Sequence, residues 1–284
     1  MSIIEEAVRK TAEQHQRLAS TDPLHSRSRI RRVAPAPSVD ASQAKRFQPI
    51  ALDNKLLEQN RILPRITDQA ALRAYKILRT RVLRRLEANQ WRSFAVTGVT
   101  AGEGKTLTAI NLAMALAQDV NTWVFLVDLD LQRPRVAQYL GMTGLAGEKG
   151  LSDYLTGDAT LESIIYSPNI DRFSVIPNFQ PTAQSSELLA SPRMLELVRA
   201  LENEAPRRIV VFDMPPILAA DDVLAFSPQL DGLLLVVGEG ATSRDSLRSA
   251  KEVLAEMNLL GVVLNRSTER DDNAYYSYGQ PAKT

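Results

Sequence analysis

The sequence predicts an α/β fold, in which helices cover both faces of a mostly parallel sheet. From Ser93 onward, short continuous apolar runs alternate with helical patterns. A glycine-containing loop joins the first apolar run to the first of these helices, and two later runs end in aspartate. Continuous apolar runs are typical of strands that are buried on both faces. Their alternation with helices predicts parallel strands linked by helical crossovers.

The expected elements follow one another in chain order. The expected strands are Ser93–Thr97, Thr122–Asp128, Phe173–Pro177, Arg208–Asp213, Gly232–Val237 and Gly261–Leu264. The expected helices between them are Gly104–Gln118, Ser191–Glu204 and Ser243–Met257. Before the first strand, apolar residues recur at helical spacing and predict a helix over residues 67–88, which Thr67 or Asp68 can cap. Arginine and lysine cover the rest of that helix.

The pattern divides the chain into four parts. Residues 1–18 form a short amphipathic helix pattern, and residues 19–64, which are rich in proline, serine and arginine, are expected to be a flexible linker. The alternating pattern fills a main domain over residues 65–268. Residues 269–284 form a polar, tyrosine-rich tail.

Composition excludes several classes of protein. The 284 residues include no cysteine and two histidines, which excludes disulfides and thiolate metal sites and argues against a zinc site. Lysine plus arginine number 34 against 33 acids, so the net charge predicts no nucleic-acid partner. No apolar run approaches the ~20 residues that span a bilayer. We therefore expect a cytoplasmic protein, for which any membrane association would require a partner.

The segment from Thr97 to Thr106 reads TGVTAGEGKT and predicts a phosphate-binding loop. Glycines allow a tight turn whose N–H groups face phosphate oxygens, at the positive end of the next helix. Lys105 can reach the β- and γ-phosphates, and the Thr106 hydroxyl can bind Mg²⁺. The spacing is G-x₅-G-K-T, one residue longer than the common form. The expected nucleotide contacts are Thr100, Ala101, Gly102, Glu103, Gly104, Lys105, Thr106 and Leu107.

Two apolar runs end in aspartates, one at Asp128 and Asp130 and the other at Asp213. Carboxyl ends of parallel strands meet at one edge of a sheet, beside the expected nucleotide. Mg²⁺ prefers few carboxylates together with phosphate and water. We therefore expect Thr106, Asp128 and Asp213 at a metal site, and Lys105 with Asp128, Asp130 and Asp213 as the catalytic set. Capping of a turn is the alternative role for Asp128 and Asp130.

Two further features have open interpretations. Asn265 ends the last expected strand and could contact a nucleotide base or belong to a turn. Tyr275, Tyr276 and Tyr278 crowd into the tail and indicate either a modification site or non-specific contacts. Each phosphate would add about −1.5 to −2 charge there.

Together these motifs resemble the bacterial tyrosine kinases, the autokinase family of capsule and exopolysaccharide synthesis. The resemblance covers residues 68–279 through GVTAGEGKT, FLVDLDLQRP, IVVFDMPP, SELLASPRM and LLGVVLNR. The opening MSIIEEAVRK resembles stand-alone members from exosortase-type loci. The resemblance implies a MinD/ParA-like P-loop fold and an enzyme that uses Mg-ATP to phosphorylate its own tail tyrosines, and thereby regulates polysaccharide assembly or export.

The resemblance also implies roles for single residues. Asp128 would accept the tyrosine proton, Asp130 and Asp213 would organise Mg²⁺, and Asn265 would face adenine. The implied partners are a membrane protein that governs polysaccharide chain length and activates the kinase, and a tyrosine phosphatase.

Two departures from the family pattern bear on activity and assembly. The second motif has Gln132 in place of arginine, followed by Arg133. The helical motif E-x-x-R-x-x-R reads Arg73-x-x-Lys76-x-x-Arg79, which removes the acid that would meet a neighbouring subunit. A homo-oligomer is therefore an open expectation.

Two alternative functions remain at this point. A MinD/ParA-like ATPase switch or scaffold would bind nucleotide without phosphorylating tyrosine, although its extra loop lysine is here Thr100. A degenerate kinase that only binds nucleotide is the other alternative, because of Gln132 and Arg73.

Overall fold

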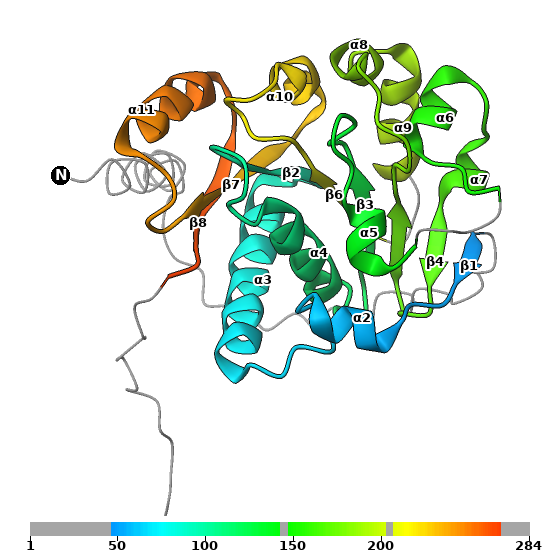
Figure 1. Cartoon of the computed structure of the whole chain (residues 1–284), viewed down its shortest axis with the longest axis horizontal. Coiled ribbons are helices and arrows are strands. Elements are labelled where there is room, and N and C mark those ends of the chain that lie inside the picture. The colour runs from blue at the N-terminus through cyan, green and yellow to red at the C-terminus, as the bar shows by residue number, and fades with distance from the viewer. Residues whose placement is uncertain (1–46, 143–146, 203–206, 268–284) are drawn as a thin grey trace, which may run out of the picture.

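An eight-stranded sheet organises the protein (Figure 1). The computed structural model describes residues 47–142, 147–202 and 207–267. The strands are β1 (Gln48–Ile50), β2 (Ser93–Gly98), β3 (Trp123–Asp128), β4 (Tyr166–Pro168), β5 (Phe173–Ile176), β6 (Arg208–Asp213), β7 (Gly232–Gly238) and β8 (Leu259–Asn265). Their order in the sheet is β1-β4-β5-β3-β6-β2-β7-β8. Within it, β4 and β5 pair antiparallel and the other pairs are parallel. The predicted mostly parallel sheet is confirmed.

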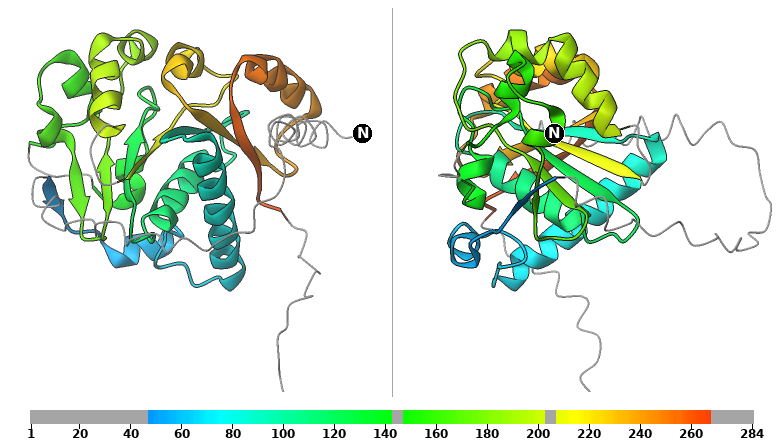
Figure 2. Two further views of the ribbon diagram at one scale, coloured as in Figure 1. Left: turned by 180° about the vertical axis from the view of Figure 1, so that it is seen from behind. Right: turned by 90° about the vertical axis from the view of Figure 1, so that its right-hand side faces the viewer.

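Helices cover both faces of this sheet, as Figure 2 shows from behind and from the side. One face carries α2 (Asn54–Gln59), α3 (Gln69–Asn89), α4 (Lys105–Leu116) and α5 (Val136–Leu140). The other carries α6 (Leu151–Thr156), α7 (Leu161–Ile164), α8 (Ser185–Leu189), α9 (Pro192–Glu202), α10 (Asp222–Phe226) and α11 (Arg244–Val253), with 3₁₀ turns η2 (Ser227–Gln229) and η3 (Leu254–Glu256). Each layer packs its own apolar core against the sheet.

The register of the central strands places the acidic strand ends together. Every residue of β2, β3 and β6 is buried, which explains their continuous apolar runs. In the ladder between β3 and β6, Asp128 lies opposite Asp213, and Val96 of β2 lies on the other side of Asp213. The loop that follows β2 therefore starts beside both aspartates.

The expected linker extends too far toward the main domain. Residues 48–64 pack against the domain instead: β1 joins the sheet beside β4, and Leu57, Ile62 and Leu63 are buried. Asn111 of α4 fixes this segment, because its side chain accepts a hydrogen bond from Leu63 N (2.8 Å) and donates to Arg61 O (3.0 Å). The prediction of a linker up to residue 64 is wrong. Isolated apolar residues of this segment, although they lie between polar residues in the sequence, pack into the hydrophobic core.

The helix predicted over residues 67–88 is confirmed as α3. Asp68 is its N-cap and accepts hydrogen bonds from the N–H groups of Ala70 (2.8 Å) and Ala71 (3.4 Å). Val82 and Leu86 are buried, and Tyr75 packs against the same core. The apolar stripe therefore faces the sheet and the basic residues face outward.

Two predicted segments lie outside the described residues: the helix over residues 1–18 and the tail over residues 269–284. Within the described ranges, none of the helices has both the length and the apolar character needed to cross a bilayer.

Candidate active site

The loop Gly98–Gly104 joins β2 to α4, as the sequence predicts. Gly102 and Gly104 have φ angles of 85° and 87°, in the left-handed region that favours glycine. Gly104 is also the N-cap residue of α4, and a Cβ there would collide with the Asn265 amide. The first N–H groups of α4 have no partner within the helix and point toward this loop. The arrangement can hold an anion such as a phosphate group.

Glu103 fixes the shape of this loop from within. Its buried carboxylate accepts hydrogen bonds from the N–H groups of Val99 (2.5 Å) and Thr100 (3.0 Å) and from the Thr100 hydroxyl (3.1 Å). The Thr242 hydroxyl, from the loop between β7 and α11, also donates to it. Glu103 is thus a structural residue of the phosphate loop. Thr242 was missed by sequence reasoning, since nothing in its local sequence marks it.

Replacing Glu103 with alanine is expected to destabilise the protein by roughly 2–3 kcal/mol, because the buried Val99 N–H and the half-buried Thr100 N–H lose their acceptor. The midpoint of urea unfolding measures this change. Glu196→Ala, which removes an exposed carboxylate on α9, is the matched control and should change stability by less than about 0.5 kcal/mol. Equal midpoints for the two variants would show that the loop does not depend on Glu103.

Lys105 contacts aspartates that lie at or just after the ends of two different strands. Its Nζ lies 2.8 Å from Asp130 Oδ2 and 3.9 Å from Asp213 Oδ1. Burial alone would lower the pKa of Lys105, but Asp213 and Asp130 together raise it above its ordinary value. The lysine is therefore charged. In this nucleotide-free form it balances carboxylates that would otherwise repel one another.

Asp128 is fully buried at the end of β3. Its Oδ2 accepts hydrogen bonds from the N–H groups of Arg135 (3.0 Å) and Val136 (2.9 Å), and its Oδ1 accepts one from Asp130 N (3.2 Å). Burial raises its pKa well above the ordinary value, and the nearby Asp213 raises it further. Asp128 therefore stabilises the turn into α5 through these backbone hydrogen bonds.

Asp213 is the least satisfied polar group of the site. Both of its carboxylate oxygens are buried, and neither has a hydrogen-bond partner among the described residues. Burial raises its pKa to about 6, although Lys105 and the neighbouring Thr106 hydroxyl act in the opposite direction. A buried carboxylate without donors fits a cation or its bound water. Asp213 and the Thr106 hydroxyl could therefore hold a magnesium ion.

Asn265 and Leu107 complete the predicted set. The Asn265 Nδ2 donates a hydrogen bond to the Glu103 carbonyl (2.8 Å), so the end of β8 contacts the phosphate loop. Leu107 packs against the core beneath α4. The structure brings the residues predicted to bind nucleotide and metal together at one edge of the sheet. The three tail tyrosines lie outside the described residues.

Gln132 belongs to a polar network that sequence reasoning did not foresee. Its Nε2 donates to the Ser185 hydroxyl (2.9 Å), and that hydroxyl donates to buried Asp222 (2.7 Å). The network links the turn after β3 to the first residues of α8 and α10. At the position where the family motif has arginine, Gln132 thus supplies a neutral hydrogen-bond donor to Ser185 and Asp222.

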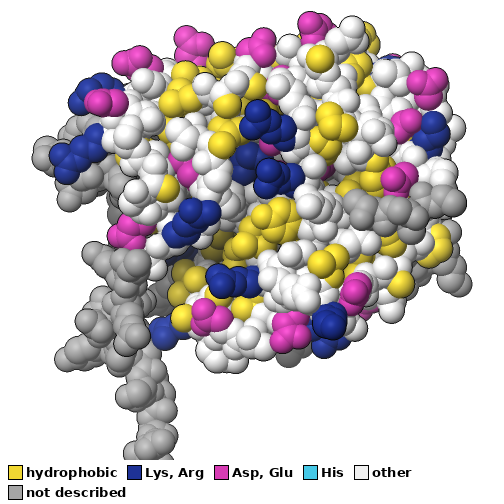
Figure 3. All heavy atoms as spheres, in the orientation of Figure 1, with side chains coloured by type: hydrophobic (Ala, Val, Ile, Leu, Met, Phe, Trp, Pro, Cys, Tyr) yellow, Lys and Arg dark blue, Asp and Glu magenta, His cyan; other side chains and the backbone are white. Residues whose placement is uncertain are grey.

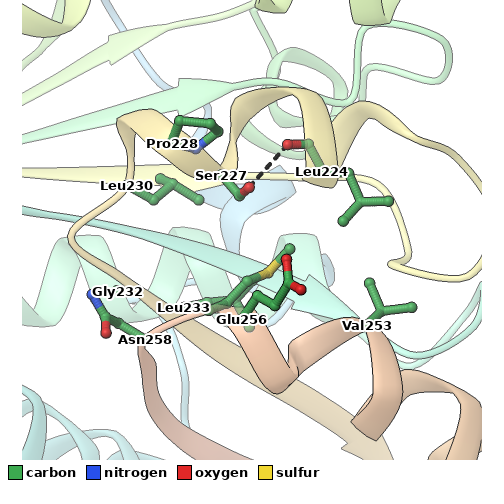
Figure 4. Close-up of a pocket in the computed structure, with 10 residues that line it drawn as sticks. Leu224, Ser227, Pro228, Leu230, Gly232, Leu233, Val253, Glu256 and Asn258 are labelled. Carbon is green, nitrogen blue, oxygen red and sulfur yellow. Dashed lines mark hydrogen bonds between the residues drawn. The ribbon is translucent and has the colours of Figure 1, made fainter.

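A separate pocket of about 250 Å³ lies at the opposite end of β7 (Figure 4). Leu224, Leu230, Leu233 and Val253 line it together with Glu256. Gly232, the first residue of β7, marks its place at the amino ends of the strands. This lining offers phosphate no cation, so we assign the nucleotide to the phosphate loop.

Comparison with known proteins identifies the family. Residues 94–278 match the model of the CobQ/CobB/MinD/ParA nucleotide binding domain. The tyrosine-protein kinase YwqD of Bacillus subtilis is 32% identical over 207 residues, which cover 72% of this chain and 85% of YwqD. The tyrosine-protein kinase CpsD of Streptococcus agalactiae is 31% identical over 66% of this chain and 81% of CpsD. The chain belongs to the bacterial tyrosine-protein kinases.

Solved structures agree with this assignment. The kinase domain of Escherichia coli tyrosine kinase ETK superposes with a TM-score of 0.57 at 29% identity, over 68% of this chain and 74% of that one. The cell division ATPase MinD of Pyrococcus furiosus gives a TM-score of 0.52 at 25% identity, over 63% of this chain and 74% of that one. The predicted MinD-like P-loop fold is confirmed. The relatives favour a tyrosine kinase over the alternative of a MinD/ParA-like switch.

Proposed function

We propose that this kinase binds Mg-ATP at the phosphate loop and transfers the γ-phosphate to Tyr275, Tyr276 and Tyr278 of its own tail. The observation that carries the proposal is the meeting of Lys105 Nζ with Asp130 and Asp213 directly after the phosphate loop. A triphosphate placed there would draw Lys105 away from the carboxylates. Those carboxylates would then face the cation and the acceptor hydroxyl.

Each residue has a defined task in this reaction. Lys105 would bind the β- and γ-phosphates together with the N–H groups at the start of α4. Thr106 and Asp213 would hold Mg²⁺, which when bound neutralises part of the phosphate charge, and Asp130 orients Lys105. Asp128, which the sequence also placed at the metal, has one free acceptor site, and we assign that site to the tyrosine. We assign Asn265 to the adenine end of the nucleotide, because it already contacts the phosphate loop.

Asp128 is the proposed acceptor of the tyrosine proton. A carboxylate has about four acceptor sites, and three backbone N–H groups occupy Asp128, which leaves room for one more donor. Burial raises the pKa of Asp128, which strengthens its carboxylate as a proton acceptor. The tyrosine oxygen forms the new bond to phosphorus, the bond to the β-phosphate oxygen breaks, and ADP leaves.

Replacing Tyr275, Tyr276 and Tyr278 together with phenylalanine is expected to remove nearly all phosphate incorporation, because the transfer then has no acceptor. Incubation with Mg-ATP followed by phosphopeptide mapping measures this. Tyr139→Phe, a half-buried tyrosine of α5, is the control and should incorporate phosphate like the parent. Phosphate that persists on other peptides of the triple variant would falsify self-phosphorylation of the tail.

We further assign this kinase to the control of exopolysaccharide or capsule assembly, with a membrane chain-length protein as activator and a tyrosine phosphatase as antagonist. The family resemblance supports this role. A chimerical protein, CapA2B2, superposes with a TM-score of 0.64 at 25% identity over 80% of this chain and 97% of its own, which is consistent with a kinase that works joined to another component. A cytoplasmic kinase recruited to the membrane by that activator fits these observations.

A further inference from the structure

The outward face of α3 carries an unusual excess of positive charge. The helix contains six arginine and lysine residues and one acid, Glu87, which pairs with Arg207 (2.8 Å). Arg79 bonds to Gln118 and Arg85 bonds to the Leu260 carbonyl. Four exposed bases remain, and none forms an ion pair with the described residues: Arg73, Lys76, Arg81 and Arg84.

These four bases share one side of the helix. At about 100° per residue, positions 73, 76, 81 and 84 fall within roughly 140° of the helix circumference. Ile77 lies between them and is 42% exposed, so an apolar side chain stands at the centre of the charged stripe. We call these five residues the α3 basic face. Figure 3 shows lysine and arginine side chains over the part of the surface where α3 lies.

The end of β8 brings the tail to this face. The Arg85 side chain of α3 contacts Leu260 of β8, and a Cβ on Gly261 would lie 3.0 Å from Arg85 Nη1. The C-terminal part of α3 therefore lies beside the first half of β8. Since α3 leads into the start of β2, it runs opposite to the parallel strands β2, β7 and β8. β8 continues four residues further, to Asn265, so its end lies toward the N-terminal half of α3.

The tail is long enough to cover the face. Ser267 is the last described residue, and Tyr275 and Tyr278 follow it by 8 and 11 positions. An extended chain spans ~3.3–3.6 Å per residue, so these tyrosines can lie up to roughly 25–40 Å away. The whole of α3 is about 30 Å long.

Phosphorylation makes the tail complementary to this surface. Residues 268–284 contain three acids and two bases, so the unmodified tail is nearly neutral. Three phosphotyrosines would add about −5 charge in total. Arginine binds phosphate through two parallel hydrogen bonds, and tyrosine rings can rest on the exposed Ile77.

We infer that the α3 basic face is the docking site for the phosphorylated tail, residues 268–284 of the same chain. The inference rests on the proposed function, because the phosphotyrosines are its product. Attachment through β8 gives the tail a high effective concentration at this face. Docking removes a modified tail from the active site and covers α3 against other partners.

The test uses a synthetic, fluorescent peptide of residues 268–284 with phosphate on all three tyrosines. It is added to the full chain carrying Lys105→Met with Tyr275→Phe, Tyr276→Phe and Tyr278→Phe, so binding does not depend on the kinase's own activity. Fluorescence anisotropy should show binding at least about tenfold tighter than for the unphosphorylated peptide, and weaker binding at higher salt.

The α3 variant carries Arg73→Gln, Lys76→Gln, Arg81→Gln and Arg84→Gln, and should lose at least about tenfold in affinity. The matched control removes exposed bases elsewhere, through Lys55→Gln, Arg61→Gln, Arg199→Gln and Arg244→Gln, and should bind within about twofold of the parent. Both variants should keep the thermal midpoint of the parent.

Three outcomes overturn the inference. The first is equal binding of phosphorylated and unphosphorylated peptide, and the second is an equal loss in both charge variants. The third is a peptide that does not bind, combined with a homo-oligomer or anionic-vesicle binding that the α3 variant abolishes, since the face then serves a second copy or a lipid surface. Failure of the proposed function is separate, because it concerns phosphate transfer and leaves peptide binding unchanged.

Discussion

Replacing Lys105 with methionine is expected to lower tail phosphorylation by about 10³-fold or more. The lysine supplies the only ammonium group that the described residues place at the phosphate loop, and the transferring phosphoryl group needs positive charge in its transition state. Methionine has a similar length and no charge, so the loss reports on electrostatics more than on packing. Transfer of labelled phosphate from ATP to the chain measures the effect.

The matched control is Lys149→Met. Lys149 is a half-exposed lysine that pairs with Asp153 at 3.0 Å, away from the phosphate loop. This variant should phosphorylate its tail at the rate of the parent. If Lys105→Met retained activity within about tenfold of the parent, the phosphate loop would not be the catalytic centre.

Replacing Asp213 with asparagine is expected to separate activity from stability. Activity should fall by roughly 10²–10³-fold, because a proposed magnesium ligand loses its charge. The free energy of unfolding of the nucleotide-free protein should rise by roughly 1–3 kcal/mol, since a buried carboxylate without hydrogen-bond donors is removed. Kinetics and thermal unfolding measured on the same preparation test both effects. Asp171→Asn, an exposed aspartate, should change neither.

The stability difference should depend on pH in a definite direction. The folded protein raises the pKa of Asp213 to about 6, above its value in the unfolded chain, so folding favours the protonated form. The wild type therefore gains stability from this group as pH falls from about 7 toward about 4. The advantage of Asp213→Asn should be largest near pH 8 and should vanish at the acidic end of this range. An advantage that grew on acidification would contradict the assigned pKa shift.

The sheet could be predicted because its signals are local and strong. Runs such as Trp123–Val127 and Ile209–Phe212 are apolar at every position, and only strands covered on both faces require this. The phosphate loop could be predicted from its glycines, because positions 102 and 104 adopt left-handed backbone angles that favour glycine. The aspartates could be placed at the nucleotide because topology brings carboxyl ends of parallel strands together.

The missed features depend on contacts between distant parts of the chain. Residues 48–64 have linker composition, yet Asn111, about 50 positions away, supplies the hydrogen bonds that fix them. Thr242 reaches Glu103 across 139 positions, and Gln132 reaches the Ser185–Asp222 pair in a similar way. No local pattern encodes such partners. The short helices α5, α6, α7, α8 and α10 were also missed, because four to six residues give too little periodicity.

A crystal structure of the chain with Mg²⁺ and a non-hydrolysable ATP analogue would test the proposed site directly. We expect one triphosphate on the loop Gly98–Gly104, with Lys105 Nζ on its phosphate oxygens and Asp213 beside the cation. The present 2.8 Å contact between Lys105 and Asp130 should lengthen as the lysine turns to the phosphates. A nucleotide bound elsewhere, with that ion pair intact, would contradict the central claim.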